Sequence, residues 1–308
     1  MIFALGAFDG FHMGHRQLLC AAEERAAKIK TRWGVITFEG HPQQFFNSDA
    51  FKFLFTPEER TLLSMYLAVP VMDKIPFTRA LADMLPADSL EYIALRNKID
   101  GLVIGKNFRF GRARTGTPEL LTMLCKERGW SLDVIPSYTM GGNVVSSTAI
   151  RELILRGNME NACKMLGHPY IIQGKIIKGD CRGRTLGFPT ANMGVKTGKV
   201  YPRRGSYTAL VNIGGVWYPA ALNMGYNPTF EGIRSLRCET HIIGFSGDLY
   251  GTNLTVFLTS RNRDEMKFSN ADELKIQLAK DIRAAETAGR EYLTQNKAIM
   301  NKFGTLPL

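Results

Sequence analysis

Residues 6–15 have the sequence Gly6-Ala7-Phe8-Asp9-Gly10-Phe11-His12-Met13-Gly14-His15. An apolar run, residues 2–5, predicts a buried strand before this stretch, and an Ala-rich segment, residues 16–28, predicts a helix after it. The first N–H groups of a helix have no partner inside it, so a strand-to-helix junction of this kind can bind phosphate. Glycines would let the backbone come close to a polyphosphate. His12 and His15 would project to one side of the first helical turn, where an imidazole can donate to an oxyanion.

A glycine-rich turn with two surface histidines is the plainer interpretation of this stretch. Two histidines around Gly14 at a strand-to-helix junction favour a nucleotide site instead. The stretch resembles the His-x-Gly-His signature of the nucleotidyltransferase superfamily. The longer string Gly-x-Phe-Asp-Gly-x-His-x-Gly-His resembles the form found in bacterial bifunctional riboflavin kinase/FAD synthetases.

Length and composition indicate a globular protein of two domains. The chain has 308 residues, with 45% hydrophobic and 22% charged residues, which is ordinary for a soluble protein. No apolar run approaches the ~20 residues needed to cross a bilayer, and no signal peptide is visible, so we expect no membrane association. The five cysteines are scattered and include no Cys-x-x-Cys pair. This pattern disfavours a disulfide framework or a zinc site and predicts a cytoplasmic protein.

The net charge of +11 is compatible with several kinds of partner. It suits nucleic acid or an anionic membrane, and equally sites for polyanionic small molecules such as ATP and flavin phosphates. The basic residues are spread along the chain without a long Lys/Arg run. The charge is therefore weak evidence for any one of these partners.

Strands alternate with helices through residue 157, which predicts an α/β doubly wound, Rossmann-like N-terminal domain. Further strands are predicted at residues 33–38, 101–105 and 132–135, and further helices at residues 57–67, 89–96, 118–129 and from the serines at 146–147 to about 157. Thr56 is the expected N-cap of the helix that starts at Pro57, with Glu59 completing a capping box.

Two segments follow predicted strands, at the edge where doubly wound folds bind ligands, and a third lies at a predicted helix start. His41-Pro42 could be a plain turn, and Phe108-Arg109-Phe110 could be packing aromatics around a solvated arginine. Ser147 or Thr148 could be a simple N-cap, although hydroxyls and Arg151 at a helix start also suit phosphate.

The resemblance gives each segment a role. The family carries Phe-x-Pro-His-Pro where this chain has Gly40 before His41-Pro42, and it also carries Gly-x-x-Phe-x-Phe-Gly and Ser-Ser-Thr-x-Ile-Arg. It implies flavin binding by His41, Pro42, Asn107, Phe108, Arg109 and Phe110. It also implies that His12 and His15 are catalytic and that the ATP phosphates are bound by Gly6, Phe8, Gly14, Ser147, Thr148 and Arg151.

At Gly167-His168-Pro169 the predicted pattern changes from alternating strands and helices to short strands and turns. We therefore expect domains at residues 1–168 and 169–308. Short strands are predicted at residues 170–178, 206–213, 216–222, 236–245 and 254–258, and a helix at 271–290. Gly214-Gly215 is a hairpin signal. The second domain is therefore predicted to be an antiparallel β-barrel with a closing C-terminal helix.

The second domain contains the motif Gly183-Arg184-Thr185-Leu186-Gly187-Phe188-Pro189-Thr190-Ala191-Asn192. Thr190 and Asn192 offer hard oxygen ligands for Mg²⁺. A glycine-proline loop between strands is the alternative. The motif resembles the riboflavin kinase signature at every defined position, and later segments at residues 223–230, 239–241, 247–251 and 263–268 also resemble that family.

The kinase resemblance assigns further residues. It implies that Thr190 and Asn192 bind Mg²⁺ and, with Gly183 and Gly187, the ATP phosphates. A carboxylate on an apolar strand, such as Glu239, is either a paired structural charge or a general base, and the family uses it as the base.

The resemblance implies a bifunctional enzyme that phosphorylates riboflavin to FMN with ATP and adenylylates FMN to FAD with a second ATP. Its small-molecule partners would be riboflavin, FMN and ATP, with no nucleic acid and no membrane, and a homo-oligomer is compatible with it. One alternative is an enzyme with a single retained activity, such as an adenylyltransferase whose barrel only docks flavin. A basic nucleic-acid-binding protein, suggested only by the charge, is a weaker alternative.

Overall fold

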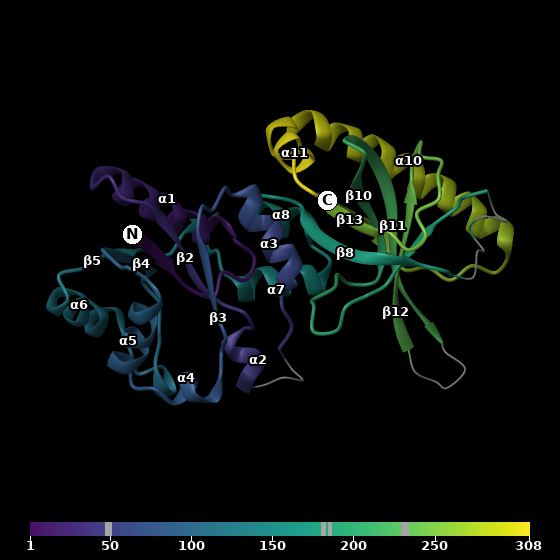
Figure 1. Cartoon of the computed structure of the whole chain (residues 1–308). Coiled ribbons are helices and arrows are strands. Elements are labelled where there is room, and N and C mark those ends of the chain that lie inside the picture. The colour runs from purple at the N-terminus through teal and green to yellow at the C-terminus, as the bar shows by residue number, and fades with distance from the viewer. Residues whose placement is uncertain (47–50, 180–182, 184–186, 229–233) are drawn as a thin grey trace. The chain divides into compact units, whose positions relative to one another are not determined.

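A computed structural model describes the chain except for residues 47–50, 180–182, 184–186 and 229–233 (Figure 1). The chain forms two compact units, Met1–Ala149 and Ile150–Leu308. Within the described part of the chain, no helix has both the length and the apolar character that a membrane span requires.

The first unit is built on a parallel sheet with the strand order β3-β2-β1-β4-β5, which confirms the predicted doubly wound fold. The strands are β1 (Ile2–Leu5), β2 (Trp33–Phe38), β3 (Met72–Ile75), β4 (Gly101–Gly105) and β5 (Ser131–Ile135). β1 is buried along its whole length, as expected for a strand covered on both faces. The sequence pattern does not predict β3, because Asp73 and Lys74 interrupt its apolar character and an edge strand tolerates such charges.

Helices separate these strands along the chain, and several of them complete the core of the sheet. They are α1 (Met13–Lys28), α2 (Pro42–Phe46), α3 (Pro57–Tyr66), α4 (Arg79–Asp83), α5 (Pro86–Arg96) and α6 (Pro118–Glu127). Leu90 of α5 and Leu121 of α6 join Phe3 and Leu102 of the sheet in one hydrophobic cluster. A 3₁₀ turn η1 (Arg112–Arg114) and two short paired strands, β6 (Thr139–Met140) and β7 (Asn143–Val144), complete the connections.

Strand order positions the first site. The chain passes from β1 through α1 to β2 on one side of β1, while β4 lies on its other side. Connections that leave in opposite directions open a crevice at the carboxyl ends of the two strands, and doubly wound folds bind ligands there. The residues that follow β1 and β4 are the predicted phosphate loop and the segment that starts at Lys106.

The second unit contains a closed antiparallel barrel with the order β10-β11-β12-β9-β8-β13, which confirms the second predicted fold. Its strands are β8 (Tyr170–Ile177), β9 (Ala191–Met193), β10 (Gly205–Ile213), β11 (Val216–Pro228), β12 (Arg234–Ile242) and β13 (Asn253–Asp264). Gly214 and Gly215, at φ 59° and 84°, form the predicted hairpin turn between β10 and β11.

Helices flank the barrel. They are α7 (Ser147–Arg156), whose first turn belongs to the other unit, α8 (Met159–Leu166), α10 (Ala271–Gln295) and α11 (Lys297–Gly304). α10 is the predicted closing helix and runs along β10 and β11 (Figure 1). A Cβ on Gly289 would lie 2.9 Å from Pro219 Cβ, so the missing side chain lets this helix approach the barrel closely.

Candidate active sites

The loop after β1 is held in an unusual backbone conformation by buried aromatic rings. Phe8 and Phe11 have φ values of 46° and 45°, a region that bulky residues seldom adopt. Both side chains are fully buried and their rings stack 5.5 Å apart. Such strain persists where the surrounding structure enforces it, commonly at functional sites. The sequence pattern did not indicate that these aromatics anchor the loop.

A buried carboxylate fixes the middle of the loop. Asp9 is 1% exposed, and its carboxylate accepts hydrogen bonds from the backbone N–H groups of Leu54 and Phe55 at 3.1–3.4 Å. Ser147 Oγ donates to the Asp9 carbonyl oxygen at 2.7 Å. The structure thus brings the predicted residue Ser147 to the phosphate loop. Ser146, rather than Ser147 or Thr148, accepts from the start of α7, through the Ala149 N–H.

The two histidines form a stacked pair at the start of α1. Their ring centroids are 3.7 Å apart with an interplanar angle of 14°. His12 is the N-cap of α1, because its Nδ1 accepts from the His15 backbone N–H at 3.2 Å. For this reason α1 starts at Met13, before the predicted residue 16. A neutral His12 then carries its proton on Nε2, where it can donate to an anion. A Cβ on Gly14 would lie 3.2 Å from the His12 ring, so this glycine leaves room for the ring.

The environment keeps His15 neutral. Burial lowers the pKa of its imidazole well below the usual value of 6.5. Electrostatic repulsion from His12, Arg60 and His41 lowers that pKa further. His15 Nδ1 is buried and has no hydrogen-bond partner among the described residues. A buried polar atom of this kind is normally satisfied, so it indicates that a ligand group binds here.

The predicted flavin-binding residues form two groups, one after β2 and one after β4. The His41 ring stacks on Phe51 with centroids 4.2 Å apart, and His41 Nδ1 accepts from the Gln43 backbone N–H. Pro42 is the first residue of α2.

In the second group, the Phe108 and Phe110 rings lie 5.7 Å apart and pack partly on the core. Arg109 is exposed and donates to the Phe108 carbonyl oxygen. Asn107 Nδ2 lies 3.4 Å from Ser137 Oγ.

A second site lies in the barrel, where strand register aligns three polar side chains. Glu239 on β12 pairs with Asn223 on β11 and with Asn192 on β9. All three line a cavity of about 270 Å³, together with Thr190 and Gly183. The structure therefore gathers the predicted base, the predicted Mg²⁺ ligands and one of the predicted phosphate-binding glycines. Gly187 sits at φ 86° in the loop before Phe188. Motif residues 184–186 lie outside the described part of the chain, as do Thr229 and Phe230.

Close packing fixes the two proposed metal ligands. A Cβ on Gly179 would lie 2.3 Å from Asn192 Nδ2, so a larger residue there would displace the Asn192 side chain. His241 Nδ1 donates to the Pro189 carbonyl oxygen at 2.8 Å and ties the Thr190 loop to β12. The Thr190 hydroxyl and the Asn192 amide oxygen, with the Glu239 carboxylate in register beside Asn192, are the hard oxygen donors that suit Mg²⁺.

One wall of this cavity comes from α10, and the sequence did not reveal it. Arg263 on β13 donates from Nε and Nη2 to the Asp281 carboxylate at 2.6–3.1 Å, and Gln277 donates to the same carboxylate at 2.8 Å. Leu274 and Leu278 add apolar surface. Arg263 belongs to a segment that resembles the kinase family, but nothing local in the sequence couples it to a helix residue 18 positions away.

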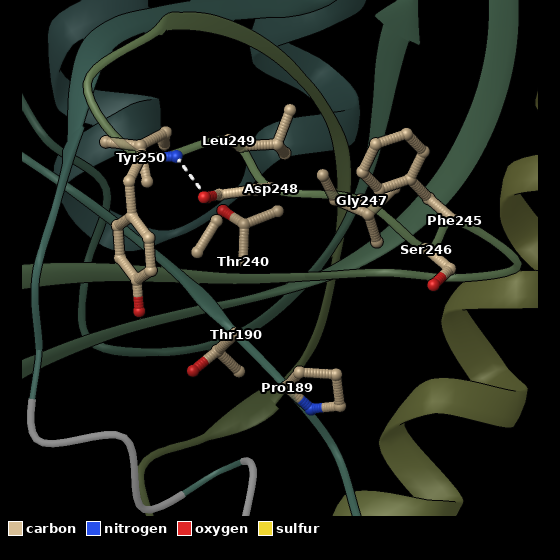
Figure 2. A pocket seen from close by; sticks show the side chains of 12 residues that line it. Pro189, Thr190, Thr240, Phe245, Ser246, Gly247, Asp248, Leu249 and Tyr250 are labelled. Atoms are coloured by element: carbon tan, nitrogen blue, oxygen red, sulfur yellow. Dashed lines mark hydrogen bonds between the residues drawn. The ribbon is translucent and has the colours of Figure 1, made fainter.

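A larger cavity of about 590 Å³ lies beside the first one in the barrel. Figure 2 shows Pro189 and Thr190 on one side of it and the loop that carries Asp248 and Tyr250 on the other. Asp248 accepts from the Tyr250 backbone N–H at 2.9 Å, which holds this loop in a turn. Thr190 lines both cavities, so the two are adjacent.

Comparison with known proteins matches a different family to each half of the chain. A family model described as FAD synthetase matches residues 1–149, and one described as riboflavin kinase matches residues 166–288. The bifunctional riboflavin kinase/FMN adenylyltransferase of Escherichia coli (strain K12) is 33% identical over 301 residues, covering 96% of this chain and 94% of that protein. This chain belongs to the bifunctional riboflavin kinase/FMN adenylyltransferase family.

Other proteins match the chain over a similar length. The enzyme of the same name from Bacillus subtilis (strain 168) is 31% identical over 289 residues, with 92% of this chain and 91% of that protein covered. A crystal structure titled as a macrolide-efflux protein from Streptococcus pneumoniae superimposes with a TM-score of 0.83 at 31% identity, covering 96% of this chain and 93% of that one.

The lowered pKa of His15 makes the first unit sensitive to acid. Below about pH 6.5 the unfolded chain binds a proton at His15, while the folded chain does so only at lower pH. The unfolded state then holds more protons, so the free energy of unfolding should fall as the pH falls through this window. His15→Gln should therefore lose less stability than the wild type between about pH 7.5 and about pH 5.

Urea unfolding in a Trp217→Phe background measures this effect, because the two remaining tryptophans, Trp33 and Trp130, both lie in the first unit. Gln17→Ala, at an exposed position of α1, serves as the control and should follow the wild-type pH dependence. Equal pH slopes for His15→Gln and the wild type would contradict the assignment.

Proposed function

We propose that this chain phosphorylates riboflavin to FMN with ATP and then adenylylates FMN to FAD with a second ATP, releasing pyrophosphate. One observation carries the proposal: each family match falls on a compact unit that has its own site. The FAD synthetase match ends at the same residue, 149, as the first unit. We assign adenylyl transfer to residues 1–168 and riboflavin phosphorylation to residues 169–308.

In the first unit, adenylyl transfer depends on alignment and charge stabilisation. The FMN phosphate attacks the α-phosphorus of ATP, and because this phosphate is already ionised near pH 7 no strong base is needed. His12 and His15 donate to the ATP phosphates, and the loop glycines Gly6 and Gly14 let the backbone approach them. The buried ring of Phe8 anchors the loop.

The remaining residues of the first site complete the binding of both substrates. Ser147, Thr148 and Arg151 at the start of α7 are assigned to the ATP phosphates. The flavin ring is assigned to the aromatic groups after β2 and β4, since their flat faces suit stacking. These groups are His41 with Pro42, and Phe108 and Phe110 with Asn107 and Arg109.

In the barrel, Glu239 acts as the general base for the kinase step. It takes the proton of the ribityl 5′-hydroxyl as that oxygen attacks the γ-phosphorus of ATP and ADP leaves. Thr190 and Asn192 would hold Mg²⁺, which when bound neutralises charge on the phosphates. The cavity with the α10 wall suits the flavin, because one side is apolar and the other carries Glu239. The larger cavity, which shares Thr190 with the smaller one, suits ATP, and Gly183 of the smaller cavity and Gly187 are assigned to its phosphates.

The cellular setting follows from the substrates. Riboflavin, FMN and ATP are metabolites of the cytoplasm, and the four cysteines in the described part of the chain are free thiols. We therefore assign the protein to the cytoplasm.

Time-resolved separation of riboflavin, FMN and FAD, after incubation of the purified chain with riboflavin and Mg-ATP, tests the function. FMN should appear first and FAD should follow. FMN that never becomes FAD, or FMN that is adenylylated by an enzyme unable to phosphorylate riboflavin, would reduce the function to one activity. The absence of both products would refute the proposal.

His15→Ala should lower FAD formation from FMN by ~10²–10³-fold, the usual effect of removing one positioned donor. FMN formation from riboflavin should stay near the wild-type rate, because that step takes place in the barrel. The two half-reactions are assayed separately, with Gln17→Ala as the matched control on the same helix. A parallel loss of both activities would contradict the two-site assignment.

Glu239→Gln should have the opposite effect. The amide cannot accept the hydroxyl proton, so the kinase step should slow by ~10²–10⁴-fold while FAD formation from added FMN persists. Glu286→Gln, in a surface ion pair with Arg290 on α10, is the control and should keep both activities. Full kinase activity in Glu239→Gln would exclude this residue as the base.

A further inference from the structure

Arg60 is a buried cation directly beneath the phosphate loop. It lies on α3 and is 3% exposed. Its Nη2 donates to the Ala7 carbonyl oxygen at 3.1 Å and to Thr37 Oγ1 at 2.9 Å, and its Nη1 donates to the Phe38 carbonyl oxygen at 3.2 Å. Thr37 Oγ1 donates to the same Ala7 carbonyl at 3.0 Å. The guanidinium thus links the ends of β1 and β2 at the base of the loop.

All of these acceptors are neutral. Arg60 forms no ion pair with a carboxylate in the described part of the chain, and its Nε is buried without a hydrogen-bond partner there. The negative charge that attracts Arg60 is that of Asp9. The Asp9 carboxylate, however, is bound to the N–H groups of Leu54 and Phe55. A buried charge without a paired counter-charge is costly, so its presence calls for a compensating anion.

The positive charge acts on the phosphate loop. Ala7, whose carbonyl Arg60 holds, comes directly before Phe8, and Arg60 is one of the charges that repel a proton from His15. At such short range in a poorly solvated site a fixed charge acts far more strongly than it would in water. An ATP triphosphate bound by this loop would supply the missing negative charge.

We propose that Arg60 is a positioning residue for adenylyl transfer, whose unpaired charge attracts the ATP phosphates from behind the loop while its hydrogen bonds hold Ala7 in place. It does not touch the reacting atoms. The inference rests on the proposed adenylyl transfer at residues 6–15 and adds to it the group that compensates the triphosphate charge in the protein interior.

Arg60→Met and Arg60→Lys separate charge from volume. Arg60→Met keeps the apolar bulk and removes the charge, so the KM for Mg-ATP in FAD formation should rise by about 10- to 100-fold. Arg60→Lys keeps the charge and should lose less. The kinase reaction of each variant is the internal control.

An NMR titration of His15 measures a pKa that would not change if Arg60 contributed only packing. The charged and titratable groups that act on this ring are His12 on α1, Arg60 on α3 and His41 after β2, with Asp9 near Arg60. The pKa of His15 should rise in Arg60→Met, because one repelling charge is gone, and should stay low in Arg60→Lys.

Arg128→Met is the matched control, because Arg128 is a partly buried arginine of the same unit that pairs with Glu91. It should change neither the KM for ATP nor the His15 titration. If Arg60→Met does not fold, as judged by circular dichroism, Arg60→Gln takes its place. An Arg60→Met or Arg60→Gln enzyme with the wild-type KM and an unchanged His15 pKa would overturn the inference. Failure of the wild type to make FAD from FMN would instead overturn the proposed function.

Discussion

The first site depends on the hydrogen bond from the His15 backbone N–H to the ring of His12. This bond caps α1, and it brings the two imidazoles into a stack with centroids 3.7 Å apart. Two positive charges at that separation would repel each other strongly, so the two rings are not both charged at once, and burial adds to the effect at His15. The loop therefore presents ring donors and helix N–H groups to a ligand, with the fixed positive charge of Arg60 close by.

The neighbouring contacts support that one arrangement. Buried Phe8 and Phe11 hold the backbone at positive φ, and the Asp9 carboxylate accepts hydrogen bonds from backbone N–H groups. Ser147 reaches the same loop through the Asp9 carbonyl oxygen. Polar residues of the motif thus divide into two kinds: Asp9 shapes the loop, and the histidines are the residues proposed to bind the ATP phosphates.

In the barrel, strand register brings the polar residues of the second site together. Asn223, Glu239 and Asn192 come from three neighbouring strands and meet because each is the register partner of the next. Cross-strand neighbours lie close together, so a short row of polar residues can serve both a hydroxyl and a metal ion. The pair of Arg263 and Asp281 then brings α10 over this row and gives the cavity an apolar side.

The sequence by itself determined the alternating strands and helices of the first unit, the barrel hairpin at Gly214-Gly215 and the two motif loops, because each depends on residues close together in the chain. It did not determine that Phe8 adopts positive φ, nor that Arg60 binds the Ala7 carbonyl from 53 residues away. Those features arise only when β1 and β2 lie side by side with α3 packed near their ends. Local periodicity carries no information on such partners, since burial and strand order choose them.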